Sequence, residues 1–309
     1  MRHLRPWLVS FLAVCGLLLV GEHASATGAQ RTFVSAQHGD DLNACTPAAP
    51  CRTFAHAISL TAYAGEVIAV DSGGYGAFTI SGAISITAAP GVYAGISVFS
   101  GDGIGVSAGV SDSVVLRGLT INGLGGAFGI NFSSGRLLSV EGCTVTGLSN
   151  DGLKVNPGAD AFVLVNSSVL GRNVGDGINV FQNGGGTTAI DVNQSKLDGN
   201  GSRGFETASG RSVVSGSSAI GNGNAGFAVF FDAQLTLEGC VVAHGSSFGI
   251  LANMSTGAGY VVHVSNCTVT NNGTGLINVD TGTMATRSNN TIENNGADTS
   301  GTITTYTAK

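Results

Sequence analysis

Short apolar segments recur along this chain, and most of them follow a glycine. After Gly129 and again after Gly152, the first and third residues are apolar and the second is polar. This spacing of two is typical of a β-strand with one buried face. The spacing of the first and third residues recurs after Gly177, Gly204, Gly226 and Gly249, with Thr or Ala in the third position at two of these sites and an apolar second residue after Gly226 and Gly249.

A second segment precedes each of these strands and begins at a recurring position. Its first residues are Leu119, Cys143, Ser168, Ser195, Ser217, Cys240, Cys267 and Asn290, at steps of 22 to 27 residues. Such a period, with short strands, Asn/Gly turns and no helical pattern, is typical of a solenoid with one repeat per coil. Leucine-rich repeats would need more Leu, calcium-binding rolls would need Gly-Gly-x-Gly-x-Asp tandems, and a left-handed helix would need a strict six-residue period. The variable steps favour an all-β protein, a single-stranded right-handed parallel β-helix of about 24 residues per coil.

The residues before the coils predict a cap. Phe54, Ala57 and Ile58 have helical spacing within residues 53–62. A solenoid needs its open strand edge covered, so we expect residues 27–64 to form an N-terminal cap that contains this short helix. The β-helix itself is expected over residues 65–309.

Residues 1–26 have the three parts of a secretory signal peptide. Arg2 and Arg5 precede an apolar run over residues 7–20, and Ala24-Ser25-Ala26 forms a small-x-small cleavage site. The apolar run is shorter than the ~20 residues that cross a bilayer. We therefore expect a secreted protein, extracellular or periplasmic, that does not span a membrane.

The composition excludes several classes of protein. Gly accounts for 49 of the 309 residues, and the charged residues make up 10% of the chain, against a usual ~25%. A hydrophobic fraction of 43% excludes intrinsic disorder. The net charge of −6 argues against electrostatic capture of nucleic acid.

The cysteines fall into two groups. Cys45 and Cys51 enclose a Pro-rich loop, and we expect a disulfide between them in an oxidising compartment. Cys143, Cys240 and Cys267 share the recurring inward position, where a free Cys acts as a small buried hydrophobe. A bridge between Cys240 and Cys267, in adjacent coils, is the alternative.

The start of the mature chain resembles a known family. The relevant segments are Thr32-Phe33-Val34-Ser35, Gly39-Asp40-Asp41, Pro50-Cys51-Arg52-Thr53-Phe54 and Gly65-Glu66-Val67-Ile68. With the repeats, they resemble secreted right-handed β-helix proteins of the pectin-lyase-like superfamily, over nearly the whole mature chain. The resemblance implies the fold of pectate lyases, polygalacturonases and uronan epimerases. Their motifs are missing, because the only Asp-Asp pair lies in the expected cap and no Gly-His-Gly, Arg-Ile-Lys or Arg-x-Pro-x-x-Arg segment occurs.

Aligning the coils brings together the densest charge group of the chain. It consists of Asp151, Asp176 and Arg203 in the position before the repeated Gly, and Lys154, Asn179 and Glu206 in the position two residues after it. On a parallel sheet these would form two columns on the outer face, about 10 Å tall. Such groups can bind a saccharide, share a proton or abstract one. We predict that these six residues bind substrate, and we assign no catalytic residue.

The two aspartates also have a structural interpretation. An Asp before a Gly is typical of a turn, in which the carboxylate accepts a hydrogen bond from the backbone and the Gly takes positive φ. Phe230-Phe231 is a second candidate contact, because two consecutive strand residues cannot both point inward. We expect no metal and no cofactor, because no metal-ligand spacing relates the histidines of the mature chain, His38, His56, His244 and His263.

Two functions fit these features. In the first, a secreted β-helix binds glycan or cell-surface components without catalysis, because charge is scarce and enzyme motifs are missing. In the second, the protein is a divergent polysaccharide lyase or glycoside hydrolase that acts on a uronan-type polysaccharide through Asp151, Asp176, Arg203 and their neighbours. The polymer and the oligomeric state are open at this point.

Overall fold

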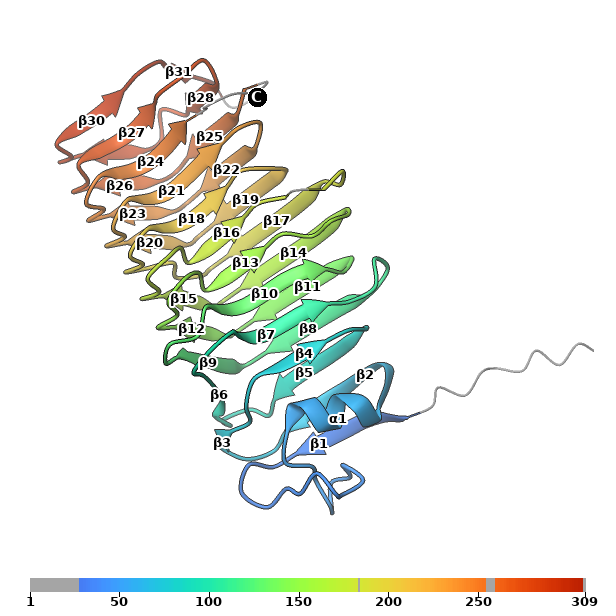
Figure 1. Ribbon diagram of the computed structural model, residues 1–309. Helices are drawn as coiled ribbons and strands as arrows, with labels where there is room; N and C mark the ends of the chain where they lie inside the picture. Colours follow the sequence, from blue (N-terminus) through green and yellow to red (C-terminus); the bar gives the residue numbers. More distant parts are fainter. Residues whose placement is uncertain (1–27, 183, 254–258, 308–309) are drawn as a thin grey trace, which may run out of the picture.

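The computed structural model describes residues 28–182, 184–253 and 259–307 (Figure 1). The expected signal peptide, residues 1–26, lies outside the described residues. The chain winds into a parallel β-helix whose coils stack along one axis. The all-β solenoid predicted from the repeats is therefore confirmed.

Successive coils contribute strands to three parallel faces, here named sheets A, B and C. Sheet A contains β1 (Ala29–Val34), β2 (Thr61–Ala69), β5 (Ile84–Ala88), β8 (Ser113–Arg117), β11 (Leu137–Glu141), β14 (Ala161–Asn166), β17 (Thr188–Asn193), β19 (Arg211–Ser215), β22 (Gln234–Glu238), β25 (Val261–Ser265), β28 (Thr283–Thr286) and β31 (Ile303–Thr305). Sheet B contains β3 (Gly73–Gly74), β6 (Ala94–Val98), β9 (Leu119–Gly123), β12 (Thr144–Thr146) and β15 (Val169–Gly171), then β20 (Ser218–Ile220), β23 (Val241–Ala243), β26 (Thr268–Thr270) and β29 (Thr291–Glu293). Sheet C contains β4 (Phe78–Ile80), β7 (Asp102–Ser107), β10 (Phe128–Ser134), β13 (Leu153–Val155), β16 (Ile178–Val180), β18 (Arg203–Thr207), β21 (Ala225–Phe230), β24 (Phe248–Asn253), β27 (Thr274–Asn278) and β30 (Ala297–Ser300).

The repeated Gly marks a close approach of backbones at the start of the sheet C strands. A Cβ on Gly177 would lie 2.6 Å from the carbonyl oxygen of Gly204, and one on Gly204 would lie 2.7 Å from that of Gly226. The pattern repeats along the column, so any larger side chain there would collide with the next coil. The repeated Gly is therefore required by stacking, not by an unusual φ.

The recurring position of the repeats is a column of stacked side chains. The Ser168 hydroxyl accepts a hydrogen bond from the Cys143 N–H (3.1 Å), and the Ser195 hydroxyl accepts one from the Ser168 N–H (3.2 Å). Farther along, the sulfur of Cys267 accepts a hydrogen bond from the Cys240 N–H at 3.3 Å. These contacts satisfy backbone groups that are buried between coils.

The three repeat cysteines are buried free thiols. The alternative of a Cys240–Cys267 bridge is wrong, because Cys267 uses its sulfur as a hydrogen-bond acceptor instead. Burial raises the pKa of Cys143 to about 11, which keeps that thiol protonated and unreactive at neutral pH.

A second polar column lies inside the turns between sheets B and C. The side-chain amide of Asn173 donates to Asn200 Oδ1 (3.1 Å), and that of Asn200 donates to Asn222 Oδ1 (3.2 Å). All three side chains are buried. Each Asn oxygen also accepts a backbone N–H from the coil before it, so the column joins consecutive coils.

The predicted helix is α1 (Phe54–Leu60), which covers the first coils (Figure 1). It begins after Thr53, whose hydroxyl accepts a hydrogen bond from the His56 N–H, the usual role of an N-cap residue. Phe54 is buried against the rings of Tyr75 and Phe78, with centroids 4.9 and 5.1 Å away. Strand β1 precedes the helix and pairs with β2, so sheet A begins within residues 27–64. Across the described residues, no helix is long and apolar enough to cross a membrane.

We predict that Ile178→Asp destabilises several coils. Ile178 is fully buried in β16, and an unpaired carboxylate in the core costs several kcal/mol. Val213→Asp is the matched control, because Val213 in β19 is 41% exposed on the outer face of sheet A. Thermal melts followed by circular dichroism should show a lower Tm for the first variant and little change for the second. If the two variants have the same Tm, the side chain at position 178 does not point into the core and the assignment of inward and outward positions is wrong.

Candidate functional site

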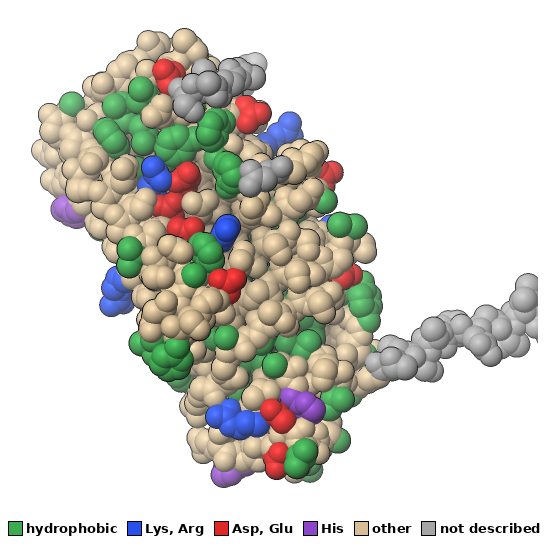
Figure 2. Space-filling view, viewed as in Figure 1, with side chains coloured by type: hydrophobic (Ala, Val, Ile, Leu, Met, Phe, Trp, Pro, Cys, Tyr) green, Lys and Arg blue, Asp and Glu red, His purple; other side chains and the backbone are tan. Residues whose placement is uncertain are grey.

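The six predicted site residues lie together on the outer face of sheet C, and they are called the six-residue cluster below. Lys154, Asn179 and Glu206 occupy matching positions in β13, β16 and β18. Asp151 and Asp176 come just before β13 and β16, and Arg203 opens β18. Figure 2 shows acidic and basic side chains side by side on this face. The predicted columns are therefore present.

The aspartates are bound to the backbone of the next coil. Asp151 Oδ1 accepts the N–H of Asp176, and Asp176 Oδ1 accepts the N–H of Arg203, both at 2.8 Å. The turn interpretation is thus right that these carboxylates bond the backbone. It is wrong about the glycine, because Gly152 and Gly177 do not have positive φ.

The Arg203 guanidinium is paired within the protein. It forms an ion pair with the Glu206 carboxylate and lies 3.8 Å from Asp176 Oδ2. On its other side, its central carbon lies 5.0 Å from the centre of the Phe230 ring. The side chains of Asp176, Glu206 and Arg203 are only 4%, 17% and 23% exposed. The three side chains are on the predicted outer face but are largely covered, because they pack against one another and Arg203 also packs against Phe230.

Burial has a chemical consequence for Glu206. Loss of solvent around its carboxyl group, together with the nearby Asp176, outweighs the attraction of Arg203 and raises the pKa of Glu206 to about 7. Burial also raises the pKa of Asp151. A carboxyl group that titrates near neutral pH is suited to general acid–base chemistry.

Lys154 remains accessible at the other end of the cluster. It is half-buried, and its ammonium lies 4.6 Å from the centre of the Phe128 ring, a cation–π contact. Asn131 and Asn179 flank Lys154 in the same column. This part of the outer face offers polar side chains to solvent.

An apolar patch continues the outer face beyond the cluster. Phe230 is the outward member of the Phe230-Phe231 pair, because it packs on the outside of sheet C while Phe231 leaves the strand with φ of 54°. The patch, green over β21, β24 and β27 in Figure 2, contains Ala225, Ala228, Leu251, Phe230, Phe248 and Ile277. The sequence singles out only the Phe pair; the alternation along β21, β24 and β27 would also have identified Ala228, Leu251 and Ile277.

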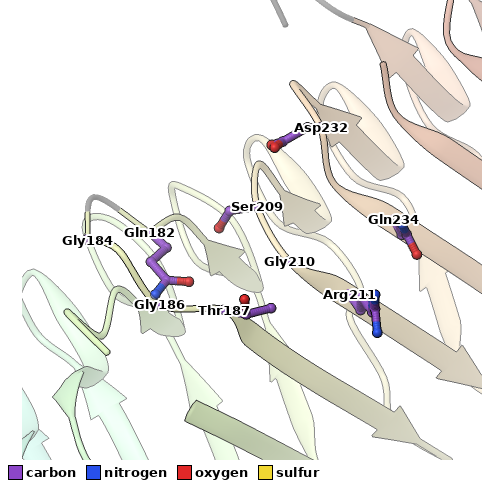
Figure 3. Close-up of a pocket in the computed structure, with 9 residues that line it drawn as sticks. All are labelled: Gln182, Gly184, Gly186, Thr187, Ser209, Gly210, Arg211, Asp232 and Gln234. Atoms are coloured by element: carbon purple, nitrogen blue, oxygen red, sulfur yellow. The ribbon is translucent and has the colours of Figure 1, made fainter. Parts of the chain in front are cut away.

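A polar groove lies where sheet C turns into sheet A (Figure 3). It has a volume of about 330 Å³ and is lined by Gln182, Gly184, Gly186, Thr187, Ser209, Gly210, Arg211, Asp232 and Gln234. This volume is within the range of small-ligand sites. The repeats did not predict the groove, because most of its residues lie in turns whose length changes from coil to coil.

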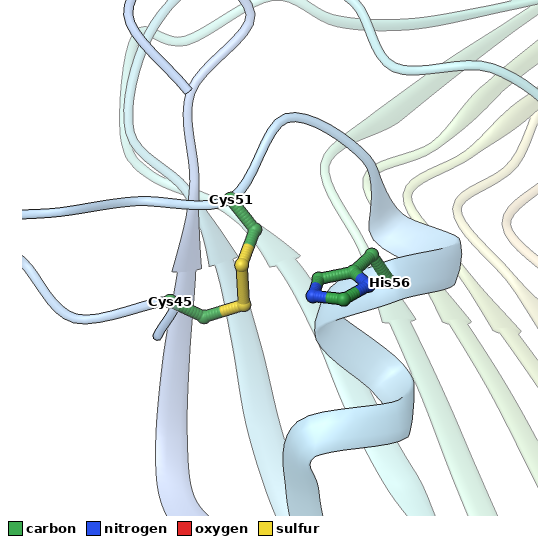
Figure 4. Close-up of side chains that lie close together, drawn as sticks. All are labelled: Cys45, Cys51 and His56. Carbon is green, nitrogen blue, oxygen red and sulfur yellow. A yellow bond between two sulfur atoms is a disulfide. The ribbon is translucent and has the colours of Figure 1, made fainter. Parts of the chain in front are cut away.

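Three side chains in the cap bring potential metal-ligand atoms close together (Figure 4). The sulfur atoms of Cys45 and Cys51 and a ring nitrogen of His56 lie within 4.8 Å of one another. The two sulfur atoms are bonded to each other, which confirms the predicted disulfide. Neither is then available as a thiolate ligand.

Comparison with known proteins places the chain in a family. The family model "Right handed beta helix region" matches residues 68–213 and 186–297, so the protein belongs to the right-handed β-helix family. The predicted handedness, and the fold that the pectin-lyase-like resemblance implies, are confirmed.

Two solved structures share the fold. The pectate lyase Pel9A superposes with a TM-score of 0.67 at 16% identity, over 91% of this chain and 78% of that chain. A rhamnogalacturonan lyase superposes with a TM-score of 0.51 at 10% identity, over 83% of this chain and 72% of that one. No curated protein sequence matches this chain. At these identities the likeness concerns the fold alone.

We predict that Glu206 makes stability depend on pH. Folding raises its pKa from 4.5 to about 7, so the folded protein binds more protons than the unfolded chain between these values. The free energy of unfolding therefore falls as pH rises through this range. Urea denaturation at pH 5 and pH 8 should show that Glu206→Gln, which cannot ionise, loses less stability than the wild type.

The exposed Glu238 at the end of β22 provides the control. Glu238→Gln should keep the pH dependence of the wild type. If Glu206→Gln also keeps it, the Glu206 carboxyl group titrates as it does in the unfolded chain, and the argument for a perturbed acid is lost.

Proposed function

We propose that this protein is a secreted β-helix that binds a polysaccharide chain along the outer face of sheet C without cleaving it. The observation that carries the proposal is the column Asn131–Lys154–Asn179–Glu206, in register on four successive strands and half-buried at each position. Amide and ammonium groups repeated at the strand spacing suit a ligand that is itself a linear repeat of hydroxyl-bearing rings.

Aromatic side chains support the same role. Phe128 lies beside Lys154, and Phe181, which follows β16, is 40% exposed. With Phe230 they give the outer face apolar rings next to polar groups. Clefts that bind small molecules combine these two kinds of surface. The fold likeness to a pectate lyase and a rhamnogalacturonan lyase is consistent with a polysaccharide ligand.

We infer that the polysaccharide is not cleaved, because the two aspartates of the six-residue cluster are already bonded within the protein. Asp151 and Asp176 each accept a backbone N–H from the next coil. Carboxylates engaged in this way hold the coils together and have little freedom to act as an acid or base on a substrate.

One observation favours the second candidate function, a polysaccharide lyase or glycoside hydrolase. The pKa of Glu206 is raised to about 7, which is where a general acid or base works best at neutral pH. Glu206 is then the residue on which that alternative depends.

We predict that Lys154→Ala combined with Asn179→Ala weakens polysaccharide binding by roughly 5- to 30-fold, the effect of losing one or two kcal/mol. Lys196→Ala is the control, because Lys196 is exposed on the sheet B side of the coils. Affinity electrophoresis in gels that contain uronan or neutral polysaccharides measures the effect, with circular dichroism to verify folding.

Two results would contradict the proposal. Unchanged retention of the double variant would move the binding face elsewhere. The second result is release of reducing ends or of unsaturated products by the wild type but not by Glu206→Gln. It would mean that the protein is a polysaccharide lyase or glycoside hydrolase and not a non-catalytic binding protein.

Secretion is part of the proposal and has its own test. Expressed with its natural N-terminus in a bacterial host, the protein should be recovered outside the cytoplasm with Thr27 as its first residue, because a small-x-small site ends at Ala26. N-terminal sequencing of the exported protein reads this directly. Recovery of the intact N-terminus in the cytoplasm would overturn export.

A further inference from the structure

We infer that the groove between sheets C and A is a second binding site, for an uncharged sugar ring held through its hydroxyl groups. That the ligand is a saccharide rests on the proposed function; the place of the site and the neutral character of the sugar come from the groove itself. The groove begins three residues past Asn179, at Gln182, so it lies beside the proposed binding face.

Opposite charges line the groove without pairing. Arg211 opens β19, and Asp232 lies in the turn after β21; both side chains are exposed. Within the parts of the chain that the structure describes, neither the Arg211 guanidinium nor the Asp232 carboxylate has a hydrogen-bond or ion-pair partner. One donor group and one acceptor group are therefore available to a ligand in the same hollow.

Another part of the groove lining, Gln182, is fixed by hydrogen bonds. Gln182 is held by Thr188, whose hydroxyl donates to Gln182 Oε1 (2.9 Å), and by its own contact with the Ala159 carbonyl oxygen (3.4 Å). The Ser209 Oγ is buried and has no hydrogen-bond partner among the described residues.

These groups match a sugar hydroxyl better than an anion. A hydroxyl both donates and accepts, so the hydroxyls of a sugar can accept from Arg211 and donate to Asp232. Gln234, in register with Arg211 on the adjacent strand, adds an amide. A uronate carboxylate would gain from Arg211 but would be repelled by Asp232. The groove therefore favours a neutral ring.

Isothermal titration tests this with neutral xylo-, manno- and cello-oligosaccharides and with oligogalacturonate as the charged comparison. At least one neutral oligomer should bind the wild type more tightly than oligogalacturonate does. Arg211→Gln should weaken that binding by roughly tenfold, because a hydrogen bond from a charged group is lost. Arg172→Gln, at an exposed Arg in the turn after β15, should leave it unchanged.

Each other outcome has a defined meaning. Unchanged affinity in both Arg211→Gln and Gln234→Ala would overturn the site, and tighter binding of oligogalacturonate would overturn the neutral ligand. If Lys154→Ala combined with Asn179→Ala weakens binding while Arg211→Gln does not, the groove fails and the proposed function stands. If only Arg211→Gln weakens binding, the groove stands and the outer face of sheet C loses its role.

Discussion

The distance between coils governs the whole structure. Backbones in successive coils lie one strand spacing apart, roughly 4.8 Å, so each side chain must fit the residue at the same position above and below it. Where the backbones come closest, only Gly is tolerated, as the 2.6 Å approach of a Cβ on Gly177 to the next coil demonstrates. Where room is slightly greater, Ser, Cys and Asn fill the position and also accept the N–H of a neighbouring coil. The spacing between coils therefore determines both the size of the side chains that the repeated positions accept and their ability to form hydrogen bonds.

This constraint is why the fold could be predicted from the sequence. Positions that recur along the chain correspond to columns in space, and the repeats alone align Cys143, Ser168 and Ser195 correctly. The helix over Phe54–Leu60 and the Cys45–Cys51 disulfide follow from local signals, namely helical spacing and a short Pro-rich loop. The first strand, β1, is not predicted from the sequence as part of the sheet, because residues 35–60, most of the expected cap, separate it from its partner β2.

The candidate site could be predicted only in part. Aligning the coils brings the six polar residues together, because the strand register alone determines which residues are neighbours in successive coils. It could not reveal that Asp176 is buried or that Arg203 is covered by Phe230, because these depend on where long side chains pack after the strands have formed. Nor could it reveal the groove, whose residues belong to turns and follow no period. The repeat therefore predicts which side chains share a column, but it does not predict how deeply they are buried or how the turns are shaped.

The unequal turns have a consequence for how such a protein diverges. The connection from β16 to β17 takes residues 181–187, whereas the next two connections on the same edge take only residues 208–210 and 231–233. The groove is the step between a long turn and its short neighbours. Insertions and deletions at this edge can reshape the groove without altering a stacked position in the core. The shape of this surface and the stability of the core therefore depend on different parts of each coil, and related chains can exchange one set of turns for another on an unchanged scaffold.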